Sequence, residues 1–293
     1  MDYRGRFAPS PTGLLHFGSL VAAVGSWLCA RHAGGRWLVR MEDIDPPREV
    51  PGSATAILAA LPAFGLIADE PVLYQSQRRA ACDEAFARLR DIGAVFPCWC
   101  SRSELAAAGP HRDGRCTSVP NPSRAPAWRL RTPDIAIAFD DALQGPQRQN
   151  LREAAGDFVI RRVEGLYAYQ LACVVDDAHQ GITEVVRGCD LLDSTPRQIH
   201  LQRLLGLRTP RYRHLPLALD AQGRKLSKST QALPVDPAAP LPALRRALAF
   251  LGQPVPAQAR DAPEMLAAAL RRFDPARMPH CSVHFADRGV MNP

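Results

Sequence analysis

The first part of the chain alternates between helical and extended hydrophobic patterns. Residues 18–33 carry apolar side chains at the three- and four-residue spacing of one buried helix face, and residues 37–41 form a short apolar strand. Helical patterns follow over residues 53–64 and 76–92. The strand leads directly into three acidic residues, Glu42, Asp43 and Asp45. Because ligand sites in open α/β sheets lie at the carboxyl ends of the strands, we expect a site there.

Residues 94–150 have a different composition, which we interpret as an insertion. Cysteines stand there among glycine and proline, and Ile135, Ile137 and Phe139 alternate with small residues as in a half-exposed strand. Strand and helix patterns then alternate again, with strands expected over residues 158–160, 182–186 and 212–219 and helices over residues 167–175 and 195–205. This alternation predicts an α/β fold with a mostly parallel sheet and helices on both faces.

The length predicts more than one structural unit. At 293 residues the chain exceeds the size at which a single hydrophobic core keeps growing. We divide it into two halves of a main domain, residues 1–93 and 151–233, an inserted subdomain, residues 94–150, and a Pro-rich linker with a short helical C-terminal region, residues 234–293.

Composition and charge narrow the class of protein. No uninterrupted apolar run approaches the roughly 20 residues of a membrane span, and the N-terminus lacks the apolar stretch of a secretory signal, so we expect a cytoplasmic protein without a membrane partner. The net charge of +7 and the pI near 9.2 favour an anionic partner such as nucleic acid or a nucleotide. Of the 36 basic residues, only Lys225 and Lys228 are lysines. Unless this placement is chance, that segment needs the compact ammonium that arginine cannot imitate.

Two segments indicate nucleotide chemistry, although the chain has neither a G-x-x-x-x-G-K-[ST] nor a G-x-G-x-x-G signature. His16, Gly18 and Ser19 stand at the entrance of the first predicted helix, where backbone N–H groups and the helix dipole bind anions such as phosphate. Lys225 and Lys228 stand on a loop that could close over a polyphosphate and neutralise charge as phosphate leaves. The alternatives are a histidine that only caps the helix and lysines on a solvated loop.

The same two segments carry a resemblance to a known family. Residues 8–13 (APSPTG) with residues 16–19 (HFGS) resemble the HIGH signature of class I aminoacyl-tRNA synthetases, and residues 225–229 (KLSKS) resemble their KMSKS signature. Residues 6–10 (RFAPS) and 41–45 (MEDID) narrow the resemblance to glutamyl-tRNA synthetases. Within that group, the short chain and its Cys-Trp-Cys segment are most similar to truncated paralogues that act on tRNA(Asp).

The resemblance implies a Rossmann-type class I synthetase catalytic domain that binds ATP with Mg²⁺, forms an aminoacyl-adenylate and passes the acyl group to tRNA. It implies that His16 contacts phosphate, that Gly18 lets adenine and ribose approach the backbone, and that Pro9 belongs to the ATP site. Ser19 stands where the signature has its last histidine, a departure expected to weaken a transition-state contact without abolishing it. The implied catalytic residues are His16, Gly18, Ser19, Lys225 and Lys228, of which Lys228 also binds ATP.

Glutamate presents two carboxylates and one ammonium, so its pocket needs two positive groups and one negative group. By the resemblance, Arg6 and Arg187 are guanidinium groups that can each grip a carboxylate with two hydrogen bonds, and Glu42 takes the α-ammonium. Tyr169 then closes the pocket with its hydroxyl. The lining also includes Ala8 and Ser10. The sequence leaves open which arginine binds which carboxylate, and the alternative for Arg187 is an ordinary ion pair with Glu184 or Asp190.

Cys98, Cys100 and Cys116 resemble a structural zinc knuckle that lacks one of the usual four ligands. In the resembled family the fourth ligand is typically a tyrosine four residues before the last cysteine, and here Arg112, which cannot bind a cation, stands at that position. His111 is adjacent and chemically suited, and water is another candidate. The alternative is three reduced cysteines packed as small hydrophobic residues.

The predicted function is ATP-dependent activation of L-glutamate without tRNA, followed by transfer to the queuosine base in the anticodon arm of tRNA(Asp), by a monomer. One rival is a glutamyl-tRNA synthetase that charges the tRNA 3′ end, but the segment after residue 229 is too short for the helical anticodon-binding region of that enzyme. A second rival is a catalytically silent tRNA-binding paralogue. A nucleotidyltransferase of the same superfamily with a small-molecule acceptor would leave the glutamate-shaped charge pattern unexplained.

Overall fold

The computed structural model describes residues 2–219, 234–280 and 283–284 of the chain. Its centre is a parallel sheet whose first part has the order β1-β2-β3, with β1 at Arg4–Phe7, β2 at Arg36–Met41 and β3 at Leu73–Tyr74. Helix α1, Phe17–His32, connects β1 to β2. The first predicted helix and the strand that follows it are therefore confirmed.

The sheet continues on the other side of β1. Strand β9, Glu184–Gly188, pairs in parallel with β10, Arg211–Leu215, which pairs in parallel with β6, Ala136–Asp141. Strand β7, Gly145–Asn150, forms an antiparallel hairpin with β6. Beside β1, the backbone N–H of Thr183 donates to the carbonyl of Arg4 at 2.9 Å, so β9 begins next to β1. These pairings confirm the predicted, mostly parallel sheet.

Side chains of β2 alternate between two cores. Trp37, Val39 and Met41 belong to the core that α1 covers. Leu38 belongs to the opposite core together with Ile199 of α7, Thr195–Leu205. Helix α6, Tyr169–His179, packs against α7. The sheet thus has helices on both faces, and its strands are apolar at successive positions because both faces are buried.

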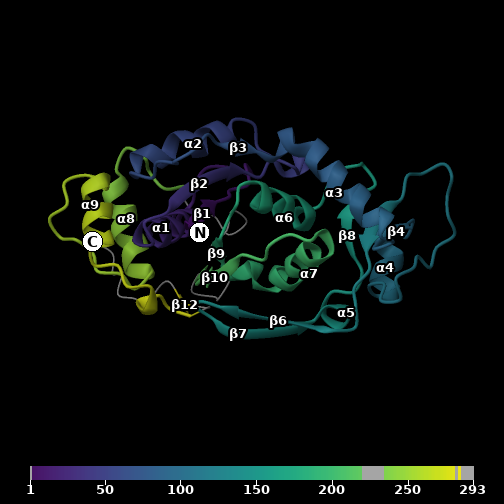
Figure 1. The fold of residues 1–293 in the computed structure, drawn as a ribbon. Coiled ribbons are helices and arrows are strands. Elements are labelled where there is room, and N and C mark those ends of the chain that lie inside the picture. The colour runs from purple at the N-terminus through teal and green to yellow at the C-terminus, as the bar shows by residue number, and fades with distance from the viewer. Residues whose placement is uncertain (1, 220–233, 281–282, 285–293) are drawn as a thin grey trace.

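A small antiparallel sheet of order β4-β5-β8 lies at one end of the molecule (Figure 1). Its strands are β4, Val95–Cys98, β5, Ala127–Leu130, and β8, Phe158–Arg161, with α4, Arg102–Ala108, after β4. The strand expected over residues 158–160 exists, but β8 pairs with β5 because Phe158 and Ile160 pack into the core beside this sheet. Conversely, the alternating strand near residue 137 is β6 of the main sheet. The extent of the inserted subdomain stays a prediction.

The remaining helices surround this framework. Helix α3, Arg79–Asp91, begins later than the pattern predicted because Ser76 donates from its N–H and its hydroxyl to Asp43, at 2.9 and 2.6 Å, within a 3-10 turn. The C-terminal helices α8 and α9 lie near α1, at the opposite end from α4 (Figure 1). The other elements are α2, Ser53–Ala63, α5, Leu151–Ala154, α8, Pro240–Phe250, α9, Ala262–Leu270, β11, Ala218–Leu219, and β12, Val283–His284, with 3-10 turns at Pro46–Arg48, Gln75–Arg78, Cys189–Ser194 and Pro275–Arg277.

Within the described ranges, every helix falls short of the length and apolarity that crossing a bilayer requires.

Candidate active site

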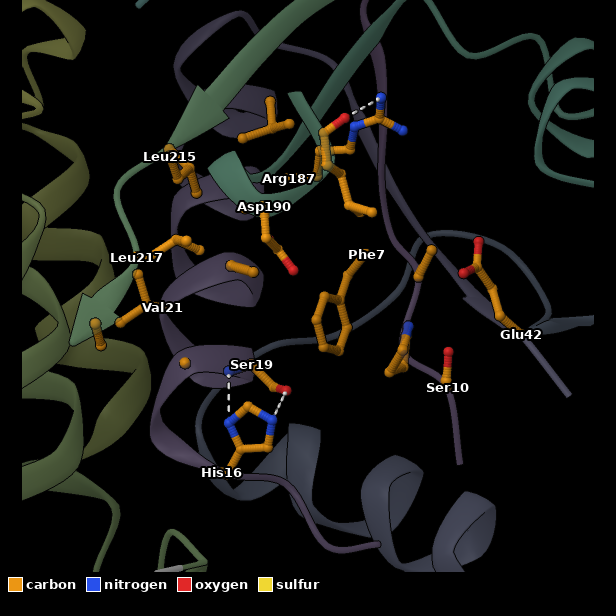
Figure 2. A pocket seen from close by; sticks show the side chains of 18 of the residues that line it. Phe7, Ser10, His16, Ser19, Val21, Glu42, Arg187, Asp190, Leu215 and Leu217 are labelled. Carbon is orange, nitrogen blue, oxygen red and sulfur yellow. Dashed lines mark hydrogen bonds between the residues drawn. The ribbon is translucent and has the colours of Figure 1, made fainter. Parts of the chain in front are cut away.

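The carboxyl ends of four parallel strands meet around one pocket (Figure 2). Residues that end or follow β1, β2, β9 and β10 line it. The chain passes from β1 through α1 to β2 on one side, whereas β9 lies on the other side of β1, and ligands of open α/β sheets bind at such a reversal of strand order. The pocket brings together ten residues that the sequence analysis singled out: Arg6, Ala8, Pro9, Ser10, His16, Gly18, Ser19, Glu42, Tyr169 and Arg187.

Arg6 is held by an aspartate that the sequence analysis did not identify. Oδ1 of Asp177, on α6, accepts hydrogen bonds from Nε of Arg6 at 3.0 Å and from Nη1 of Arg40 at 2.7 Å. Arg40 also donates to Oε1 of Glu42 at 3.3 Å. All four side chains are buried, so two guanidinium groups and two carboxylates balance each other in one cluster.

The cluster shifts the pKa values of its two acids in opposite directions. Burial by itself would raise the pKa of Asp177, but the charges of Arg40 and Arg6 hold it well below its usual range. Burial raises the pKa of Glu42, and the neighbouring Arg40 and Arg6 offset only part of this effect. Asp177 is therefore the firmly ionised member, whereas an ammonium group placed in the pocket would stabilise the charged form of Glu42.

Arg187, at the end of β9, has a buried guanidinium surrounded by neutral acceptors. Its hydrogen bonds go to Oγ1 of Thr195 and Oε1 of Gln198, both at 2.8 Å, to Nε2 of His214 at 3.0 Å, and to the Tyr169 hydroxyl and the Leu191 carbonyl, both at 3.2 Å. The alternative pairing with Glu184 is not formed, since Glu184 pairs with Arg211 and Arg213 instead. The charge of Arg187 is therefore available to an anionic ligand.

A buried acid and a histidine lie behind Arg187. Oδ2 of Asp141 and Nδ1 of His214 are 2.6 Å apart, and both side chains are fully buried. Asp141 ends β6 and His214 lies on the neighbouring β10. Burial lowers the pKa of His214, with the hydrogen bond to Asp141 acting in the opposite direction, so His214 is neutral at neutral pH.

His16 is the N-cap of α1 and contacts the residue that departs from the HIGH signature. Its Nδ1 accepts from the backbone N–H of Ser19 at 3.3 Å, and its Nε2 lies 3.0 Å from the Ser19 hydroxyl. Figure 2 shows this pair on one side of the pocket, with Arg187 and Glu42 on two others. The two lysines of the KMSKS-like segment, Lys225 and Lys228, lie outside the described residues.

The side chains of Cys98, Cys100, His111 and Cys116 converge at the small antiparallel sheet, with all four ligand atoms within 4.8 Å of one another. Bonds of about 2.3 Å to sulfur and about 2.0 Å to nitrogen at tetrahedral angles would put two sulfurs about 3.8 Å apart and a sulfur and a nitrogen about 3.5 Å apart. The distances here are 3.6 Å between Cys100 and Cys116 and 3.4 Å between Cys98 and Nε2 of His111. The donor set and spacing therefore fit a zinc ion.

Arg112 points away from this cluster. Its guanidinium donates to the backbone carbonyls of Arg152 and Glu153, at 2.9 and 3.2 Å. Burial opposes ionisation of Cys100, but hydrogen bonds from Ser118 and Thr117 lower its pKa to about 5, which favours the thiolate that a metal requires.

A family model settles the class of protein. Residues 2–239 match the model described as tRNA synthetases class I (E and Q), catalytic domain. The chain belongs to this family. The class I synthetase also has curated relatives named Glutamyl-Q tRNA(Asp) synthetase. The one from Xanthomonas campestris pv. campestris (strain 8004) is 57% identical over 282 residues, which are 95% of this chain and 94% of the relative. The one from Burkholderia mallei (strain ATCC 23344) is 58% identical over 262 residues, which are 85% and 88%.

A solved structure supports the same assignment. A glutamate tRNA ligase from Elizabethkingia meningosepticum CCUG26117, in complex with its amino acid, matches with a TM-score of 0.80 and 27% identity over 97% of this chain and 67% of that one. The class I synthetase fold with its parallel-sheet core, expected from the resemblance, is therefore confirmed. The protein is a class I aminoacyl-tRNA synthetase-like ligase, a class that uses ATP.

The sequence analysis of this synthetase missed the residues that hold the pocket arginines. Arg40 and Glu42 are two residues apart at the end of β2, a spacing that places both on one face of a strand. Asp177 gave a weaker signal, as an acid within the buried helix α6. Asp141 and His214 are 73 residues apart, and no local pattern joins them.

Proposed function

We propose that this synthetase activates L-glutamate with ATP and Mg²⁺ in the absence of tRNA, and then transfers the glutamyl group to the queuosine base in the anticodon of tRNA(Asp). In the first step a carboxylate oxygen of glutamate attacks the α-phosphorus of ATP, and pyrophosphate leaves. In the second step a hydroxyl of the modified base attacks the activated carbonyl, and AMP leaves.

The observation that carries this proposal is the charge pattern around Arg187 and Glu42. Arg187 is buried among neutral acceptors, so a ligand carboxylate would supply the counter-charge that its hydrogen bonds do not. Burial keeps the Tyr169 pKa well above its usual value, so its hydroxyl stays protonated, and that oxygen accepts from Arg187. Tyr169 can then donate its own proton to the same ligand carboxylate.

On the proposed assignment, Arg187 and Tyr169 bind one carboxylate of glutamate, Glu42 receives the α-ammonium, and Arg6 lies near the carboxylate that becomes activated. Arg6 donates at 3.0 Å to Asp177, so it approaches the substrate with its charge partly balanced. A partly balanced cation suits a carboxylate that must leave its neighbours to attack phosphorus, whereas Arg187 suits a carboxylate that only anchors the substrate.

The ATP site is proposed at the start of α1. His16 and Gly18 line the pocket beside the helix N-terminus, where the helix dipole stabilises phosphate. Pro9 and Ser19 line the same region. The two lysines of the KMSKS-like segment, Lys225 and Lys228, are proposed to neutralise the departing pyrophosphate.

The proposal extends to a structural zinc ion held by Cys98, Cys100, Cys116 and His111, to tRNA(Asp) carrying queuosine as acceptor, and to a cytoplasmic monomer. The fit of the four donor atoms to a tetrahedral site supports the zinc assignment. The names of the relatives from Xanthomonas campestris and Burkholderia mallei support the acceptor.

Glutamate-dependent exchange of labelled pyrophosphate into ATP, without tRNA, tests the activation step. We expect exchange with glutamate and much less with glutamine or aspartate. Absence of exchange would favour the silent tRNA-binding paralogue. Exchange that requires tRNA would contradict the first step and favour a 3′-charging synthetase.

A further inference from the structure

The guanidinium of Arg187 is oriented by residues from two other strands. Its Nε donates to Nε2 of His214 at 3.0 Å, and Nδ1 of His214 lies 2.6 Å from Oδ2 of Asp141. A guanidinium can only donate, so Nε2 of His214 must offer its lone pair. The imidazole proton therefore resides on Nδ1, where it is donated to Asp141.

Asp141 is itself fixed by the backbone. Its Oδ1 accepts from three backbone N–H groups, of Gln144 at 2.8 Å, of Leu143 at 3.0 Å and of His214 at 3.2 Å. Oδ2 alone remains for the imidazole. The orientation of the carboxylate thus determines the tautomer of His214, and the tautomer determines how His214 meets Arg187.

This arrangement keeps a carboxylate near Arg187 but out of contact with it. An acid directly on the guanidinium would neutralise it and admit a neutral amide side chain. A neutral imidazole between the two transmits the orientation and leaves the charge of Arg187 to the ligand. Thr195 and Gln198, both neutral, complete the enclosure at 2.8 Å.

We propose that Asp141 and His214 are positioning residues that hold Arg187 so that it selects a side-chain carboxylate over an amide. This inference rests on the proposed glutamate activation and adds the residues that determine its specificity.

Asp141→Asn tests the relay because it forces one outcome. The three backbone N–H groups require an oxygen at the Oδ1 position, so the amide nitrogen of the asparagine must face Nδ1 of His214. Nδ1 then becomes the acceptor, the imidazole proton moves to Nε2, and two donors oppose each other at Arg187. Wrong-tautomer effects of this kind are known where an aspartate orients a catalytic histidine.

In pyrophosphate exchange, Asp141→Asn should raise the KM for glutamate by about 10-fold or more, the size of one lost hydrogen bond to a charged group. It should lower the preference for glutamate over glutamine by a similar factor, with kcat within about 3-fold and the KM for ATP unchanged. The matched control is Asp69→Asn, because Asp69 also accepts from a backbone N–H and a side chain but lies at the other end of β2. The control should leave all four quantities unchanged.

Nitrogen NMR of ¹⁵N-histidine-labelled protein reads the tautomer directly. The wild type should carry the proton of His214 on Nδ1, and Asp141→Asn should carry it on Nε2. A proton on Nε2 in the wild type, or a reversed tautomer with unchanged KM and amide discrimination, would overturn the proposal.

A second pair of variants keeps the test independent of whether Asp141→Asn folds. His214→Gln retains an acceptor near the Nε2 position and should keep much of the discrimination that His214→Leu loses. Equal behaviour of the two variants would reject the positioning role. Wild-type protein without any glutamate-dependent exchange would instead reject the proposed activity, while the NMR spectrum would still report the tautomer.

Discussion

Asp177 on α6 and Arg6 on β1 form an ion pair at the pocket, with Oδ1 and Nε 3.0 Å apart and both side chains buried. The same carboxylate oxygen binds Arg40 at 2.7 Å. One acid therefore fixes two guanidinium groups from adjacent strands and joins the helix layer to the sheet. Stability and substrate binding meet at this residue.

Asp177→Asn should lower the free energy of unfolding by about 3–5 kcal/mol, because it leaves two buried guanidinium groups with less counter-charge. Chemical denaturation measures this loss. Asp91→Asn, at an exposed acid on α3, is the control and should stay within about 0.5 kcal/mol of the wild type. An Asp177 variant as stable as that control would contradict the structural role.

The pH dependence of stability should follow from the same residue. The pKa of Asp177 is lowered by folding, so its contribution is complete above the unfolded value of about 3.9 and is lost as the pH falls through the lower folded value. Denaturation between pH 7 and pH 3 should show a smaller acid-induced loss in Asp177→Asn than in the wild type. Parallel curves for the two proteins would contradict this assignment.

Much of the fold could be predicted because its signals are local. The helix of α1 and the strand of β2 follow from hydrophobic spacing, and the acids after β2 mark the carboxyl end of the sheet. The sheet to which a strand belongs depends on partners far along the chain. For this reason β6 and β8 were expected in each other's place, and the first turn of the helix before α3 was lost to contacts of Ser76 with Asp43.

The purified protein should contain about one zinc ion per chain, as expected for a closed site of four ligands. Cys98→Ser and Cys116→Ser should each lose the metal and lower the melting temperature, because binding energy becomes folding energy. Cys82→Ser is the matched control, since Cys82 is a buried cysteine of α3 outside the cluster.

His111→Ala tests the fourth ligand of that site. Its Nε2 lies 3.4 Å from the Cys98 sulfur, so its removal should reduce zinc occupancy. Full occupancy in this variant would remove His111 from the site. Metal-free wild-type protein would favour three packed thiols.

Lys228→Ala should reduce glutamate-dependent pyrophosphate exchange by roughly 10²–10³, about 3–4 kcal/mol, if the ammonium stabilises charge that develops only in the transition state. Lys228→Arg should not restore the rate, because the site is expected to need a compact cation. Steady-state kinetics separates kcat from KM. A change confined to the KM for ATP would show a ground-state contact instead.

The candidate site could be predicted only as far as its motifs reach. Arg6, Glu42 and Arg187 came from a resemblance, and the structure places all three around one pocket. Asp177 and His214, which orient two of them, could not be found in the same way. They act through contacts between segments more than 25 residues apart, such as the 27 between Arg187 and His214, and such contacts leave no periodic or motif signal.

The destination of the glutamyl group tests the central claim most directly. Labelled glutamate and ATP are incubated with the protein and total tRNA, and the tRNA is digested with a base-specific ribonuclease. The account predicts label on an anticodon-loop fragment of tRNA(Asp), and only where queuosine is present. Label on the 3′-terminal adenosine, or labelling that does not depend on queuosine, would contradict it.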